Sequence, residues 1–189
     1  MNASFLSDKF ANALPYDRYV QTGTDEQQRR WKQVYDVARL TDRHRELLSG
    51  FARDMKVLVV SGIWCGDCVQ QCPLLQRIAE GNSNRIDLRF VDRDQNRDLA
   101  DQLKLNGGDR VPVAVFLAED FEFCGAFGDR SLNRYRSLAR AQLGASCPIG
   151  LAPPDPDELG QTLQDWLNEF ERIQLMLRLS PRLRRRHND

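Results

Sequence analysis

Residues 55–68 read Met-Lys-Val-Leu-Val-Val-Ser-Gly-Ile-Trp-Cys-Gly-Asp-Cys, and this stretch decides the fold. Its first half, Met55–Ser61, is a short run rich in β-branched residues, which predicts a buried strand. Residues 66–80 are predicted to form a helix that ends at Gly81-Asn82. Cys65 and Cys68 therefore lie at the junction between a buried strand and the start of a helix.

The segments that follow alternate between strands and helices. Residues 85–91 are predicted to form a strand and residues 97–105 a helix. Residues 113–117 and 121–127 are predicted to form a hairpin of two strands, and residues 131–143 a further helix. Asn106-Gly107-Gly108 closes the second of these segments, as expected where a helix ends. Strands that alternate with helices predict a central, partly parallel sheet with helices on both faces.

Residues 1–54 are predicted to be largely helical. Residues 1–23 have weak periodicity, which indicates loop or short helix. Thr24 with Gln27 three residues later is typical of a capped helix start, and Thr41 restarts the pattern. After Thr24, apolar residues recur at helical spacing at Trp31, Val34, Tyr35 and Ala38. After Thr41, a second apolar stripe is formed by Leu47, Leu48 and Phe51, and His44 lies on the same face.

Residues 144–189 are predicted to form a linker, a helix and a tail. Residues 147–156 have the composition of a loop, and Asp155, Pro156 and Glu158 together predict a capped helix start. The helix carries an apolar stripe at Leu159, Leu163, Trp166, Leu167, Phe170 and Ile173. Four arginines then crowd the end and predict a frayed basic tail: Arg182, Arg184, Arg185 and Arg186.

The composition excludes several classes of protein. The 27 Lys and Arg residues balance 27 Asp and Glu residues, so the total charge does not favour nucleic acid. The N-terminus does not resemble a secretory signal, and residues 55–63, the most apolar stretch, are too short to span a bilayer. We therefore expect a cytoplasmic protein that binds neither nucleic acid nor membrane. Five cysteines are too few for a secreted disulfide scaffold, so closely spaced ones favour redox chemistry or metal binding.

Cys65 and Cys68 have the residue type and the position that disulfide exchange requires. A thiol at a helix N-terminus is favoured as the thiolate, because unpaired backbone N–H groups and the helix dipole stabilise negative charge. Two cysteines three residues apart can close a disulfide within one helical turn. One can then attack a substrate disulfide while the other resolves the mixed disulfide.

Four motifs occur in order along the chain: Trp64 to Cys68, Pro73 five residues after Cys68, Asp94-Gln95-Asn96, and Val111-Pro112. In these the sequence resembles the thioredoxin superfamily, whose W-C-x-x-C, helix-kinking proline, strand end and cis-proline site they match. The resemblance implies a thioredoxin-like three-layer α/β/α sandwich with a mixed central sheet over residues 55–143. A helical N-terminal extension (1–54) and a C-terminal linker, helix and basic tail (144–189) would flank it.

The resemblance also implies a function, which is disulfide exchange with protein substrates. Cys65 would be the nucleophile and Cys68 the resolving thiol, and the substrate would bind as an added strand at Val111-Pro112, beside Trp64 and Gly66. No organic cofactor and no metal are implied, because electrons would come from a reductase or a small thiol. The apolar stripes of the terminal helices also predict a possible homodimer.

Three positions depart from the family pattern. Gly66-Asp67 replaces Gly-Pro between the cysteines, Val59 replaces the buried acid six residues before the first cysteine, and Phe90 replaces its lysine partner. Losing both partners leaves no unpaired buried charge, but the usual proton acceptor for Cys68 is missing. We expect the Asp67 carboxylate to raise the pKa of Cys65 and to accept the Cys68 proton. The alternative is an acid that merely supports the first helical turn.

The other three cysteines leave alternatives open. Cys72, on about the same helix face as Cys68, is either a small buried hydrophobic residue, or a third redox thiol or metal ligand. A metal-binding protein would use Cys65, Cys68 and Cys72, with Cys124 or Cys147 as the fourth ligand; otherwise the last two are structural. A third hypothesis is a non-catalytic interaction module on the same fold, which would depend on the helical extensions rather than on the thiols.

Overall fold

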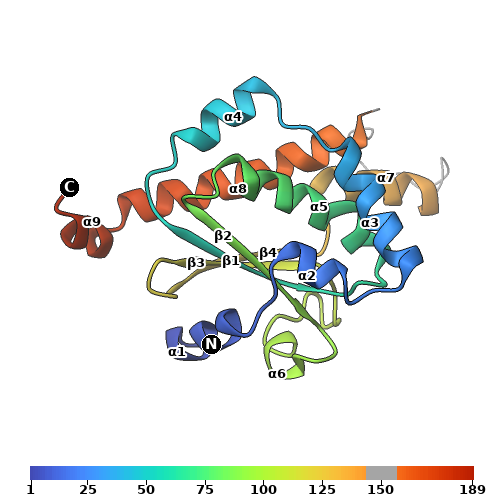
Figure 1. The fold of residues 1–189 in the computed structure, drawn as a ribbon, viewed down its shortest axis with the longest axis horizontal. Helices are drawn as coiled ribbons and strands as arrows, with labels where there is room; N and C mark the ends of the chain where they lie inside the picture. Colours follow the sequence, from blue (N-terminus) through green and yellow to red (C-terminus); the bar gives the residue numbers. More distant parts are fainter. Residues whose placement is uncertain (144–156) are drawn as a thin grey trace.

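The computed structural model describes residues 1–143 and 157–189 (Figure 1). Within these ranges the elements in chain order are α1 (Ala3–Ala11), α2 (Tyr16–Val20), α3 (Asp25–Val37), α4 (Asp42–Ser49), β1 (Met55–Ser61), α5 (Gly66–Gly81), β2 (Ile86–Asp92), α6 (Arg97–Ala100), β3 (Val113–Ala118), β4 (Phe123–Gly128), α7 (Leu132–Leu143), α8 (Glu158–Leu179) and α9 (Pro181–His187). No helix in the described ranges is long and apolar enough to cross a membrane.

The sheet is mixed, with the strand order β2-β1-β3-β4. β1 runs parallel to β2 and antiparallel to β3, and β3 pairs antiparallel with β4. The register places Val59 beside Phe90 and Ser61 beside Asp92. Val59 and Phe90 thus face each other across the two parallel strands, as their alignment with the family's acid and lysine predicts. Both side chains are fully buried, so an apolar pair fills this position.

Helices cover both faces of the sheet and form the outer layers of an α/β/α sandwich (Figure 1). Helices α3, α4 and α8 all pack against α5 on one side, and α1 and α6 lie on the other. The thioredoxin-like three-layer fold with helical extensions at both ends is therefore confirmed. Buried apolar side chains from both extensions join those of the sheet in a common core.

The N-terminal extension covers the β2 side of the sheet. Residues 1–23 form two short helices, and between them Leu14 exchanges both backbone hydrogen bonds with Phe90, which covers part of the β2 edge. The Phe90 ring lies in an aromatic cluster with Tyr16, Tyr19 and Trp31. The capped starts predicted at Thr24 and Thr41 are confirmed, because each hydroxyl accepts a backbone N–H three residues later.

In the C-terminal extension, α8 packs on α5, and α9 follows and packs on α8. The predicted stripe on α8 is buried apart from Leu159, which is partly buried, and Trp166 and Phe170 are fully covered. In the described part of the chain α8 begins at Glu158, and the Asp157 carboxylate accepts the Gly160 N–H. Asp155, Pro156 and Cys147 lie outside the described residues.

The prediction of a frayed basic tail is wrong. Residues 181–187 form α9, and Leu183 buries its side chain completely. Arg186 pairs with Glu119 at 2.8 Å, and Arg182 pairs with Asp120, in the turn between β3 and β4. Arg182 and Arg186 are therefore held by acids more than 60 residues away in the sequence, which local composition does not reveal.

The helix predicted for residues 97–105 is shorter than its pattern suggests. α6 ends at Ala100, and Leu105 and Gly108 then exchange backbone hydrogen bonds around Asn106-Gly107. Both central residues have positive φ, which suits a tight Asn-Gly turn. The turn therefore takes the backbone groups that a continued helix would have used.

Candidate functional site

Cys65 lies at the point where the β1 strand gives way to α5. It is the N-cap residue of α5, and its backbone N–H donates to the Gly62 carbonyl at 2.9 Å, which closes the turn after the strand. Its side chain is partly exposed, and its Sγ contacts the Val111 carbonyl oxygen at 3.7 Å. The backbone N–H groups of Asp67 and Cys68 face this sulfur and favour the thiolate.

Cys68, one helical turn further, is fully buried. The Gly62 N–H donates to its Sγ at 3.5 Å. Burial raises the pKa of the Cys68 thiol well above its usual value. The hydrogen bond with Cys68, followed by burial, raises the pKa of the Cys65 thiol. Because both pKa values are raised, ionising the Cys65 and Cys68 thiols at the same time is unfavourable.

Val111 and Pro112 face the dithiol from the loop before β3. Their peptide bond is cis, and the Val111 carbonyl is the group that contacts Cys65. Gly128 lies against them so closely that an added Cβ would lie 2.3 Å from the Pro112 carbonyl oxygen. A glycine is therefore required where β4 passes this loop.

The surface around Cys65 is open and partly apolar. Trp64 is 46% exposed, and the Arg93 guanidinium lies over its ring, 4.8 Å from the centroid. At Gly66 an added Cβ would meet no heavy atom within 4 Å, so this side of Cys65 is unobstructed. From within, the Trp31 indole N–H donates to the Ile63 carbonyl at 3.0 Å and fixes the loop that carries Trp64. The predicted Trp64, Gly66, Val111 and Pro112 therefore surround Cys65.

The Asp67 carboxylate pairs with two arginines. Its oxygens lie 2.6 Å from Arg130 Nη2 and 3.2 Å from Arg134 Nε. Arg130 continues to Asp129 at 3.1 Å, and Asp129 accepts from Arg110 at 3.2 Å. Arg110 directly precedes Val111, so this chain of ion pairs joins the turn between the cysteines to the loop that faces them.

Sequence reasoning missed this network. Asp129 is 3% exposed, and Tyr135 also donates a hydrogen bond to its carboxylate. Burial acts to raise the pKa of Asp129, but the hydrogen bonds from Tyr135 and Arg110 outweigh it, so the pKa lies below its usual value. The position of Arg110 beside Val111 was the available signal. Arg130 and Arg134 carry no local signal for their pairing with Asp67, because that residue lies more than 60 positions earlier in the sequence.

A second set of polar groups lies on the buried side of the dithiol. Ser61, the last residue of β1, and Cys72 in α5 are both fully buried, with Ser61 Oγ 3.6 Å from Cys72 Sγ. The Tyr19 hydroxyl of α2 is also buried and makes no hydrogen bond within the described residues. Cys72 is buried as predicted, but it borders both the Cys68 thiol and the Ser61 hydroxyl.

The described cysteines of the metal hypothesis are not arranged as a metal site. Within residues 1–143 and 157–189, no group of three or more His, Cys, Asp or Glu side chains is arranged to hold a metal ion. Cys124 lies in β4, where its Sγ contacts the Glu122 carbonyl oxygen. His44 lies at the start of α4, where its Nδ1 accepts the Thr41 N–H and completes a cap.

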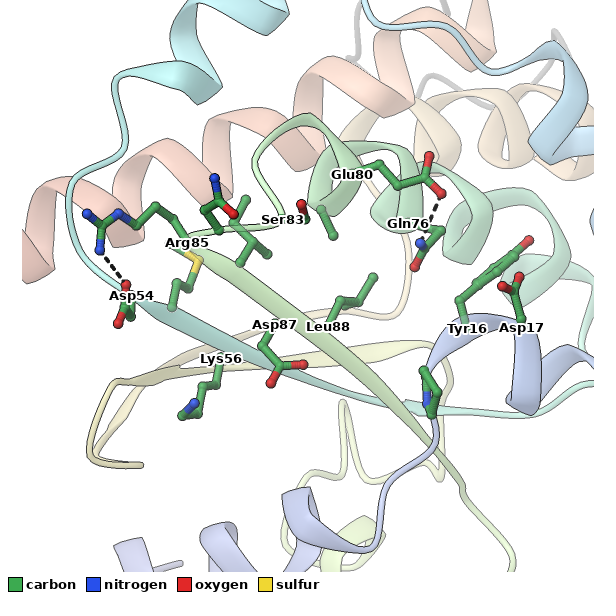
Figure 2. A pocket seen from close by; sticks show the side chains of 15 residues that line it. Tyr16, Asp17, Asp54, Lys56, Gln76, Glu80, Ser83, Arg85, Asp87 and Leu88 are labelled. Atoms are coloured by element: carbon green, nitrogen blue, oxygen red, sulfur yellow. Dashed lines mark hydrogen bonds and ion pairs between the residues drawn. The ribbon is translucent and has the colours of Figure 1, made fainter.

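The cleft in Figure 2, of about 460 Å³, lies away from the cysteines. It is lined by the first residues of β1 and β2 and by the C-terminal half of α5, and Arg85 pairs there with Asp54 at 2.7 Å. Because β1 and β2 are parallel and Cys65 follows the end of β1, the cleft and the dithiol lie at opposite ends of these strands.

Comparisons with known proteins agree with this architecture. The thioredoxin family model matches residues 13–139. A solved structure of a protein of unknown function from Pseudomonas aeruginosa is similar, with a TM-score of 0.68 and 20% identity, covering 88% of this chain and 95% of that one. An HIV epitope scaffold is similar at a TM-score of 0.62 and 19% identity, covering 86% and 97%. At this identity the likeness concerns the fold. A search of the curated proteins finds no match.

Proposed function

This chain belongs to the thioredoxin family, and we propose that it is a thiol-disulfide oxidoreductase that exchanges disulfides with protein substrates through Cys65 and Cys68. One observation carries the proposal. A partly exposed thiol at a helix N-terminus lies 3.7 Å from the Val111 carbonyl, with a fully buried thiol one turn behind it. The first sulfur can reach a substrate, whereas the second can reach only the first.

The reaction follows from this difference in exposure. The Cys65 thiolate attacks one sulfur of a substrate disulfide, which forms a mixed disulfide and releases the other sulfur as a thiol. Cys68 then attacks Cys65, the mixed disulfide breaks, and the remaining substrate sulfur leaves with the proton that Cys68 gives up. The substrate gains two electrons and the protein retains a Cys65–Cys68 disulfide. A reductase or a small thiol must return the two electrons.

The open surface around Cys65 supports a polypeptide substrate. Val111 presents its backbone beside the reacting sulfur, so an extended peptide can add to it as a short strand. The exposed Trp64 ring offers an apolar wall next to it. For Asp67 the proposed role stays tuning the pKa of Cys65, now with Arg130 and Arg134 compensating its charge, whereas the Cys68 proton passes to the departing substrate sulfur. The proposed location is the cytoplasm, where such thiols stay reduced.

The decisive experiment is substrate trapping. Cys68→Ser should accumulate mixed disulfides through Cys65, visible as dithiothreitol-sensitive complexes on non-reducing gels. Cys65→Ser should form none and should lose insulin-reduction activity. Cys124→Ser is the matched control, because it removes a half-buried thiol in β4 and should behave as the unmodified chain. A Cys65→Ser variant that keeps full activity would favour the interaction-module hypothesis instead.

The proposed homodimer rests on a separate feature. Leu175, Met176 and Leu179 are exposed on α8 although the opposite side of that helix is buried. Analytical ultracentrifugation at micromolar concentration should detect the dimer, and replacing Leu175 and Leu179 with Glu should give monomers that keep the disulfide activity.

A further inference from the structure

The buried side of the site has a polar group two residues beyond Val59. Side chains at i and i+2 of a strand point to the same face, so Ser61 extends from β1 on the side where Val59 does. Both residues are fully buried. The carboxylate that the family pattern places at position 59 is thus absent, and a hydroxyl occurs one step closer to the active-site helix.

The neighbours of the Cys68 thiol come from three elements. From the turn after β1 the Gly62 N–H donates to Cys68 Sγ at 3.5 Å, and from β1 the Ser61 hydroxyl is held 3.6 Å from the Sγ of Cys72, one helical turn beyond Cys68 in α5. The thiols of Cys65 and Cys72 are the neighbours of Cys68 on α5 itself. Burial is the main effect on the Cys68 thiol and raises its pKa, whereas the Ser61 hydroxyl acts to lower it.

The nearest carboxylate on β2 faces elsewhere. Asp92 pairs with Ser61 in the strand register, but its Oδ1 accepts the backbone N–H groups of Asp94 and Gln95 at 2.8 and 3.2 Å. It is therefore committed to the turn that follows β2. The groups that meet Cys68 from β1, the Gly62 turn and α5 are uncharged hydrogen-bonding groups when the thiols are protonated.

We propose that Ser61 is the positioning residue for resolution of the mixed disulfide, donating its hydroxyl hydrogen to the Cys68 sulfur as that sulfur becomes anionic, with Cys72 holding the hydroxyl before the step. The inference rests on the proposed function of Cys65 and Cys68. The step balances without another reactant. The Cys68 sulfur bonds to Cys65, the Cys65–substrate bond breaks, and the Cys68 proton ends on the departing substrate sulfur. The hydroxyl only stabilises the charge that develops between these events.

A two-phase reaction with Ellman's reagent separates this step from the first attack. In a full-length chain that also carries Cys124→Ser and Cys147→Ser, so that no other accessible thiol reacts, the reduced protein should release one equivalent of thionitrobenzoate when Cys65 attacks and a second when Cys68 resolves the adduct. Stopped-flow absorbance should show that Ser61→Ala slows the second phase by about tenfold, in line with loss of a hydrogen bond to a charged group. The first phase should stay within twofold, and the pH midpoint of the second phase should rise.

Two further variants keep the test informative. Cys72→Ala removes the group that holds the hydroxyl and should slow the second phase less than Ser61→Ala does, whereas Cys72→Ser retains a hydrogen-bonding partner and should restore it. Ser131→Ala is the matched control, because it removes another fully buried hydroxyl, one that contacts Thr162 rather than a cysteine. It should leave both phases unchanged.

The outcomes distinguish the inference from the proposed function. If Ser61→Ala keeps an unchanged second phase with an unchanged pH midpoint, Ser61 has no role in resolution while the oxidoreductase stands. If the chain with Ser61 in place shows no second phase, Cys68 does not resolve and the proposed function fails. Equal slowing of both phases in Ser61→Ala would indicate a damaged fold and would overturn the positioning role.

Discussion

Asp67 and Cys72 lie on either side of Cys68 in α5, and their surroundings differ in kind. Asp67 faces the surface, where Arg130 and Arg134 pair with it and Asp129 and Arg110 extend the network. Cys72 faces the core, where its neighbours are the Ser61 hydroxyl, the Cys68 thiol and tyrosines of the N-terminal extension. One side of the dithiol is built from paired charges and the other from neutral polar groups.

The difference follows from the cost of burying charge. Near the surface an ion pair keeps partial contact with water, so Asp67 can carry a charge between the cysteines. In the core an unpaired carboxylate is destabilising by several kcal/mol. Because Phe90 replaces the basic partner, a carboxylate at position 59 would have no cation to pair with. The aromatic cluster around Phe90 fills the space instead.

The largest expected effect comes from placing a charge on the neutral side. Val59→Asp should lower the free energy of unfolding at pH 7 by about 3–5 kcal/mol, because the carboxylate would have no paired cation there. Its folded-state pKa would lie above the unfolded value near 3.9, so the destabilisation should grow as pH rises from 4 to 8. Urea unfolding across that range measures it. Val59→Asn, a neutral match in size, should show no such pH dependence.

Removing the buried charge from the paired side should have the next largest effect. Asp129→Asn should lower the free energy of unfolding at pH 7 by about 2–3 kcal/mol, since it weakens the bonds from Arg110, Arg130 and Tyr135. The pKa of Asp129 is depressed, so its contribution is present above the unfolded pKa near 3.9 and is lost as pH falls through the folded pKa. In urea titrations the stabilities of the two proteins should therefore converge as the pH falls below the folded-state pKa of Asp129.

The control for that variant is Asp98→Asn. Asp98 is exposed and pairs with Lys9 at 2.8 Å, so it should change stability little. A loss for Asp98→Asn as large as that for Asp129→Asn would contradict the importance of the buried network.

A smaller effect is expected where Asp67 faces Cys65. Asp67→Asn removes a negative charge two residues from the thiolate, so iodoacetamide should alkylate Cys65 at pH 7 roughly threefold faster, within the range of a partly exposed charge interaction. The reduction potential should rise with it. Asp25→Asn, which removes a first-turn acid from α3, is the matched control. An unchanged alkylation profile would leave Asp67 as a residue that supports the helix and its arginines.

The smallest effect is expected from a change on the neutral side of the dithiol, where Ser61 and Cys72 lie. Tyr19→Phe keeps the ring stacked on Phe90 but removes a buried hydroxyl that makes no hydrogen bond within the described residues. The resolution rate should change by less than about twofold, because the Ser61 hydroxyl remains. A tenfold loss in stopped-flow measurements would move the positioning role from Ser61 to Tyr19.

Much of the fold could be predicted because its signals are local. The β-branched run of β1, the cysteines at the start of α5 and the capping boxes at Thr24 and Thr41 depend on neighbours within a few residues. The apolar stripe of α8 predicted its burial for the same reason. Helix α6 was overestimated, because beyond Ala100 the N–H groups of Gln102 and Leu103 donate three residues back, to Leu99 and Ala100, rather than four.

The sequence by itself determined the strand-to-helix junction, the thiol pair within it and the loss of the acid and lysine, since each is a matter of residue type at fixed spacing. Only the tertiary structure decided which groups surround those thiols. Asp67 pairs with Arg130 and Arg134, which lie more than 60 residues away in the sequence. Leu183 is fully buried, although the arginines around it in the sequence suggest an exposed segment. Ser61 meets Cys72 because β1 and α5 pack face to face. Such contacts form when the elements pack, and sequence periodicity carries no information about partners so far apart.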